Sequence, residues 1–242
     1  PQWAQRSDAF RYGKYFSIGA SQGGSVAMAV HRFIEQNDLT YEIPIVGSIC
    51  CDGPYDPVAT LKYFMTADTD AEHLAGELTM PVAIALIIKG MLDTNPLMMN
   101  YKVSDFFSSD FINTGILDII ANKQYESLEK TTDDVKKHLK SLRKHYPNML
   151  TSDGRANMEY VLTTDAYKYM QKLAAGETLP ENEVMDDLIS ALESNNLTKG
   201  WNPQHPICLF HSTKDTVVPY VNCRSAVSAF SSKCTLYLDN SN

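Results

Sequence analysis

A serine flanked by small residues, placed where a strand pattern gives way to a helix pattern, most constrains the fold of this chain. The pentad GASQG at 19–23 follows the short apolar run at 14–19 and precedes 25–37, where apolar residues recur at helical spacing. Glycines on both sides of a serine let a strand and a helix pass close to a tight turn. The pentad therefore predicts a strained strand-to-helix turn that lifts the Ser21 hydroxyl above a sheet edge.

Strand and helix patterns divide the chain into three blocks, 1–56, 57–200 and 201–242. The outer two read as short apolar strands separated by a helix, which is typical of parallel strands joined by crossover helices. The middle block reads as helices, starting with Asp56 as an N-cap and Pro57 at the first helical position. Because loops of this length are rarely without structure, we expect an α/β core with an inserted helical cap or lid. The expected strands are 14–19, 44–51, 206–212 and 234–240, and the expected helices include 25–37, 104–122 and 221–230.

Composition excludes two classes of partner. The 242 residues carry a formal net charge of −8, so no basic surface is expected for a nucleic-acid backbone. The longest apolar run, 81–88, is too short to span a bilayer, which argues against an integral membrane protein. The five cysteines show no metal-ligand spacing, and whether Cys223 and Cys234 form a disulfide stays open.

Serine on such a turn is a candidate nucleophile for acyl transfer. The helix that follows directs its first backbone N–H groups, beginning with Gln22, to where an oxyanion would form. A serine nucleophile also needs a base, almost always histidine, and an acid that orients it.

The segments around Ser21 and Asp215 resemble the α/β-hydrolase superfamily. The resemblance rests on SIGASQGGSVAMAV at 17–30 and PICLFHSTKDTVVPY at 206–220. Among its subfamilies, GASQGGSVAMAVHRFIE at 19–35 and CDGPYDPVATL at 51–61 look most like the secreted lipases and acyl-esterases of bacteria and fungi. The resemblance implies Asp215 as the acid, because the strand two after the serine strand commonly ends in a turn that carries it. Some hydrolases of this fold carry the acid one strand earlier, which makes Asp52 the alternative, and chain order and strand context favour Asp215. The resemblance further implies the C-terminal half of an α/β-hydrolase sheet with a large all-helical cap, and a nucleophile and acid that need no cofactor or metal. It also implies a secreted or periplasmic location and a small-molecule ester substrate, for which the apolar cap favours an apolar acyl group.

The base is the part of the triad that the pattern does not supply. In this fold the order is serine, acid, histidine, yet every histidine precedes Asp215. The histidines are His31, His73, His138, His145, His205 and His211. His31 lies roughly 15 Å along the helix from Ser21, and the simplest role for His211 is to hydrogen-bond the turn that carries the acid, although it is the one local alternative base.

Both ends of the chain suggest an interpretation as part of a longer hydrolase. Only 13 residues precede Lys14, so the strand at 14–19 would be an unpaired edge of a parallel sheet, and the base loop would follow Asn242. We expect a missing segment or a partner chain to complete the sheet. The first hypothesis is a serine esterase that works through an acyl-enzyme; the alternatives are a peptidase of the same fold and a hydrolase-like binding module without catalysis.

Overall fold

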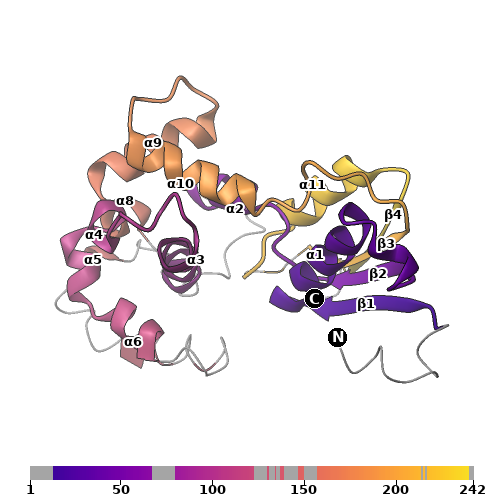
Figure 1. Ribbon diagram of the computed structural model, residues 1–242. Helices are drawn as coiled ribbons and strands as arrows, with labels where there is room; N and C mark the ends of the chain where they lie inside the picture. The colour runs from indigo at the N-terminus through magenta and orange to yellow at the C-terminus, as the bar shows by residue number, and fades with distance from the viewer. Residues whose placement is uncertain are drawn as a thin grey trace. The chain divides into compact units, whose positions relative to one another are not determined.

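The computed structural model describes residues 13–66, 80–122, 130, 134, 137–138, 147–149, 157–213, 215 and 217–239. The contacts within the chain divide it into two compact units. The first unit is Pro1–Thr60 with Asn196–Asn242, and the second is Leu61–Asn195. The first unit therefore assembles from two segments that are distant in sequence, as Figure 1 shows by the indigo and yellow ends of the chain lying together.

The first unit is built on a parallel four-stranded sheet. Its strands are β1 (Tyr15–Ala20), β2 (Ile45–Cys51), β3 (Ile207–Ser212) and β4 (Cys234–Asp239), and they lie in the order β1-β2-β3-β4. The crossover helices are α1 (Gln22–Gln36) between β1 and β2, and α11 (Val221–Phe230) between β3 and β4; a short 3₁₀ turn, η3 (Leu39–Tyr41), precedes β2. The predicted α/β core is confirmed, and each strand lies within a residue or so of its expected bounds.

Both crossover helices pack on the same face of this sheet (Figure 1). One apolar core joins them to the strands; its members are Ala27, Met28, Cys50, Tyr55, Ile207, Leu209, Cys223, Ala226 and Phe230. The strand register places Phe16, Ile18, Phe210 and Tyr237 on the opposite face, where their exposed fractions are 61%, 67%, 41% and 51%. Since parallel sheets generally bury both faces, this face is an apolar surface that the described residues leave uncovered.

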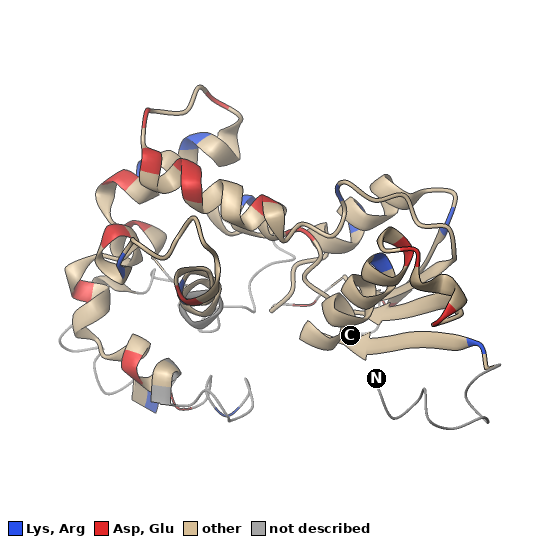
Figure 2. Cartoon of the chain, in the orientation of Figure 1, with Lys and Arg blue, Asp and Glu red and all other residues tan. Residues whose placement is uncertain are grey.

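The described part of the second unit is helical (Figure 1). Its elements are α2 (Pro57–Thr66), which begins in the first unit, α3 (Met80–Thr94), α4 (Val103–Phe106), α5 (Ser109–Asn113), α6 (Ile116–Asn122), η6 (Pro147–Met149), α8 (Met158–Val161), α9 (Thr164–Ala175) and α10 (Glu183–Ser194). Figure 2 shows acidic residues on most of these helices, with few lysines or arginines among them. No helix in the described ranges is both long and apolar enough to cross a membrane.

The expectation of a single helix at 104–122 is wrong, because two local breaks in the helical backbone divide this segment into α4, α5 and α6. Phe107 adopts an extended conformation, and the Ser108 hydroxyl then caps α5 by accepting a hydrogen bond from the Phe111 N–H. Gly115, at a φ of 74°, separates α5 from α6. The N-cap expected at Asp56 is confirmed, since its Oδ1 accepts from the Ala59 N–H at 3.0 Å.

Candidate active site

Ser21 lies on the turn between β1 and α1 in a backbone conformation that residues other than glycine rarely adopt. Its φ is 53° and its ψ is −127°, outside the ordinary left-handed helical region. Its N–H donates to the Cys51 carbonyl at 2.8 Å, and the Gly24 N–H donates to the Ser21 carbonyl at 2.8 Å. These two bonds hold a strained residue at the carboxyl edge of the sheet, and strain of this kind is concentrated at functional sites.

Close backbone contact on both sides of Ser21 requires glycine at particular positions. A Cβ on Gly19 would lie 1.9 Å from the Gly23 carbonyl oxygen, so strand and helix meet there without room for a side chain. A Cβ on Gly24 would lie 2.6 Å from the Cys51 carbonyl oxygen, whereas one on Gly23 would meet nothing within 4 Å. The close approach of strand and helix thus depends on Gly19 and Gly24. The expectation that Gly23 must lack a side chain for this approach is wrong.

The start of α1 presents a free donor beside the serine. Ser21 is exposed and its side chain makes no capping hydrogen bond. The Gln22 N–H, the first of the helix, has no acceptor among the described residues. An unpaired N–H at a helix N-terminus, beside an exposed hydroxyl, is the arrangement that an oxyanion site requires.

Three titratable side chains converge where β2 and β3 end at the same edge. Asp52, His211 and Asp215 each place one ligand atom within 4.8 Å of the others. Asp52 follows β2 with a φ of 46°, and its Oδ1 accepts from the Ser212 N–H at 2.9 Å. Asp215 lies in the turn after β3, where its Oδ1 accepts from the N–H groups of Val217 and Val218 at 2.8 and 2.9 Å.

His211 is buried and hydrogen-bonds to the turn that carries Asp215. It is 1% exposed, and its Nε2–H donates to the Val218 carbonyl at 3.0 Å. Its Nδ1 lies 3.9 Å from Asp52 Oδ1 and has no hydrogen-bond partner among the described residues. His211 and Asp215 therefore hold the same Val217–Val218 segment from two sides. This geometry favours a positioning role for His211 over that of a base.

Elsewhere in the first unit, the described histidines lie away from this edge. His31 is on α1 about ten residues beyond Ser21, and His205 precedes β3 at the opposite edge of the sheet. His138 is described, in the second unit, whereas His73 and His145 lie outside the described residues. Within the first unit, the described residues bring Ser21, Gln22, Asp52, His211 and Asp215 to one edge, without a second histidine there.

A separate buried cluster joins α1 to the segment before β3. Glu35 accepts hydrogen bonds from His31 and His205 and from the N–H groups of Trp201 and Gln204. Burial alone would raise the pKa of Glu35, but the hydrogen bonds from Gln204, His205 and His31 outweigh it and lower the pKa from 4.5 to about 2. Burial lowers the pKa of His31, and its contact with Glu35 opposes this shift.

Sequence reasoning missed this cluster and the packing role of Gly24. His31 and Glu35 are four residues apart on the buried side of the helix, a spacing that is visible in the sequence. The partners of Glu35 other than His31 lie more than 160 residues further along the chain, so only the fold reveals them. All five cysteines are free, and Cys223 and Cys234 therefore form no disulfide in this structure.

Four parallel strands joined by crossover helices, with a strained serine turn after the first strand, match part of the α/β-hydrolase fold. Solved structures with this fold match the chain at low sequence identity. The rice cell wall degrading esterase LipA from Xanthomonas oryzae matches with a TM-score of 0.64 and 20% identity over 95% of this chain and 52% of its own. A candidate hydrolase from Legionella pneumophila matches with a TM-score of 0.58 and 10% identity over 98% of this chain and 52% of its own.

Candida antarctica lipase A in its closed state also matches, with a TM-score of 0.50 and 13% identity over 95% of this chain and 44% of its own. The chain thus spans about half the length of the structures that it matches. No protein-family model matches the chain, and no curated protein matches it. Likeness at this level of identity establishes the fold and leaves the activity to be argued from the residues.

Proposed function

We propose that this chain carries the nucleophile and the acid of a serine hydrolase that cleaves carboxylic esters. The observation that carries the proposal is the backbone of Ser21, whose strained conformation is fixed by hydrogen bonds while its hydroxyl stays exposed. Backbone strain of about 1–3 kcal/mol is retained when it serves function. The esterase and lipase names of two matched structures support the choice of an ester substrate.

In the proposed reaction, Ser21 Oγ attacks the acyl carbon while its proton passes to a histidine base. The carbonyl oxygen becomes an oxyanion and accepts a hydrogen bond from the Gln22 N–H. Collapse of the tetrahedral intermediate expels the alcohol, which takes the proton from the histidine, and leaves an acyl-enzyme. Water then repeats the attack on the acyl carbon and frees Ser21, so these steps need no metal or organic cofactor.

Asp215 is proposed as the acid that orients the base. Its Oδ1 is held by two backbone N–H groups, which fixes the carboxylate, and the other oxygen, Oδ2, is proposed to accept a hydrogen bond from the histidine base. Asp52 remains the alternative acid, since its Oδ1 is likewise held by a backbone N–H, that of Ser212. Order along the chain supports Asp215, because the acid of this fold commonly follows the strand two places after the serine strand.

We propose that the base comes from further polypeptide of the same gene product, which also covers the open face of the sheet. Two observations support this: Phe16, Ile18, Phe210 and Tyr237 are exposed on that face, and the matched structures are about twice as long as this chain. An apolar acyl group and a secreted or periplasmic location remain part of the proposal. Leu86, Leu97 and Met99, all exposed in the second unit, support the apolar preference.

The test is hydrolysis of p-nitrophenyl esters of increasing acyl length by the complete gene product. Ser21→Ala should abolish turnover. Ser25→Ala is the matched control, because Ser25 lies on the same helix and only donates to the Pro54 carbonyl at 2.8 Å. The 242-residue chain alone should turn over ester poorly. Ordinary turnover by that chain would contradict a base from further polypeptide, and full activity of the Ser21→Ala variant would contradict the proposed nucleophile.

A further inference from the structure

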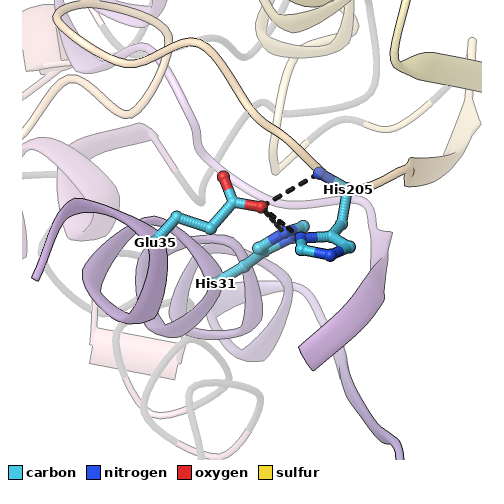
Figure 3. A group of neighbouring side chains, drawn as sticks. All are labelled: His31, Glu35 and His205. Atoms are coloured by element: carbon cyan, nitrogen blue, oxygen red, sulfur yellow. Dashed lines mark hydrogen bonds and ion pairs between the residues drawn. The ribbon is translucent and has the colours of Figure 1, made fainter. Parts of the chain in front are cut away.

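The cluster of His31, Glu35 and His205 places two imidazoles and one carboxylate around a common point (Figure 3). Glu35 Oε1 lies 2.9 Å from His31 Nε2 and 2.8 Å from His205 Nδ1. The three ligand atoms lie within 4.8 Å of one another. His31 and Glu35 come from successive turns of α1, and His205 comes from the segment before β3, so the cluster joins two elements of the first unit.

The groups behind these three atoms resemble those that surround metal ligands in proteins. The other nitrogen of His31, Nδ1, lies 3.0 Å from Ser48 Oγ, which fixes the ring orientation. Glu35 Oε2 accepts from Trp201 Nε1 at 3.0 Å and from the Gln204 N–H at 2.9 Å. Metal-binding histidines and carboxylates are commonly held by such additional hydrogen bonds, which orient the ligand and tune its basicity.

Burial of the cluster is asymmetric, which provides a route for an ion. The side chains of His31 and Glu35 are 0% and 2% exposed, whereas that of His205 is 34% exposed. An ion would therefore reach the cluster past His205, and a water molecule on that side would complete a fourth position. Two imidazole nitrogens and a carboxylate oxygen suit zinc and neighbouring transition metals better than magnesium or calcium.

We propose that His31, Glu35 and His205 bind one divalent transition-metal ion of the zinc class, which ties α1 to the segment before β3. Tetrahedral zinc with bonds near 2.0–2.1 Å requires ligand atoms roughly 3.3 Å apart. The observed separations of 2.8 and 2.9 Å must therefore widen by about half an ångström, which rotation of the exposed His205 side chain accommodates. Each imidazole binds the ion in its neutral form, and any proton displaced from a ligating nitrogen passes to solvent.

This ion has a structural role that is separate from ester cleavage. The cluster lies toward the far end of α1 from Ser21 and next to the start of β3, whereas the proposed reaction takes place where the strands end. The proposal thus stands or falls independently of the proposed function. The alternative is that the same three side chains form a hydrogen-bonded network without an ion, and the experiment separates the two.

The experiment uses the complete gene product after treatment with EDTA and buffer exchange. Zn²⁺ is titrated by calorimetry and Co²⁺ by visible absorption, and the melting temperature is measured with and without Zn²⁺. We expect one ion per chain, a Co²⁺ spectrum with the intense bands of tetrahedral N/O coordination, and an upward shift in melting temperature of several degrees. No saturable binding, or no change in melting temperature with Zn²⁺, overturns the proposal in favour of the network alone.

Two variants locate the ion. His205→Gln changes the exposed ligand, so it is expected to fold and to lose at least ten-fold in Zn²⁺ affinity. Asp215→Asn disables the second group of potential ligands, Asp52, His211 and Asp215, and should leave the affinity unchanged. Unchanged binding in the first variant, or lost binding in the second, would place the ion elsewhere and overturn the proposal.

Discussion

Replacing Gly19 with alanine tests whether the serine turn depends on backbone contact between β1 and α1. The new Cβ would lie 1.9 Å from the Gly23 carbonyl oxygen and 2.3 Å from its carbonyl carbon. Restoring ordinary van der Waals separation requires α1 to retreat by roughly 1.5 Å. The helix cannot retreat freely, because Ser21 is bonded to Cys51 and Met28 is fully buried in the core. We therefore expect Gly19→Ala to lower the free energy of unfolding by about 3 kcal/mol.

Gly23→Ala is the matched control, because it adds the same methyl group on the other side of the serine. Its Cβ would meet nothing within 4 Å, and alanine is favoured over glycine within a helix by up to about 1 kcal/mol. The assay is urea unfolding of the 242-residue chain followed by far-UV circular dichroism, with midpoint and slope compared among wild type and both variants. Equal stability of the two variants would refute the reasoning, since the predicted difference rests only on the contact at Gly19.

Three further predictions concern charge and strain. In EDTA, the free energy of unfolding should fall by about 3 kcal/mol as the pH drops from about 5 to about 2. The pKa of Glu35 is about 2 in the folded chain and 4.5 in the unfolded chain, so the ionised carboxylate stabilises the fold above pH 4.5, and this stability is lost as the pH falls through about 2. Glu35→Gln should flatten this part of the urea-unfolding profile. Ser21→Gly should raise the melting temperature, since relief of the strain at a φ of 53° contributes about 1 kcal/mol, and an unchanged or lower value would argue against strain. In the complete gene product, Asp215→Asn should lower kcat about ten-thousand-fold, and Asp52→Asn about tenfold or less because it removes one hydrogen bond to Ser212; equal losses would contradict Asp215 as the acid.

The parallel core was predictable because local patterns determine it. The apolar strands and the helix after Ser21 repeat at periods that a sequence displays directly, and the structure has them close to the expected bounds. Asp56 before Pro57 likewise gave a correct helix start. The prediction of one helix at 104–122 was wrong because it relied on periodicity and gave too little weight to two residues that end helices, the N-cap Ser108 and the turn glycine Gly115.

Long-range contacts were the part that the sequence did not reveal. Glu35 is charged and lies on a helix, which normally indicates a solvated side chain, yet it is buried by partners from the segment before β3. The packing role of Gly24 was missed for the same reason, since the Cys51 carbonyl that excludes a side chain there belongs to another strand. Convergence of Asp52, His211 and Asp215 follows from the pairing of β2 with β3, which local patterns suggest without giving distances.

Labelling with a fluorophosphonate probe, followed by peptide mapping of the complete gene product, tests the central claim most directly. A working nucleophile forms a bond from Ser21 Oγ to phosphorus as fluoride leaves. We predict that the label maps to Ser21, disappears in Ser21→Ala and persists in Ser25→Ala. A folded complete product that takes no label at Ser21, or a Ser21→Ala variant that still cleaves esters at the wild-type rate, would contradict the account; the former result would favour a hydrolase-like binding module.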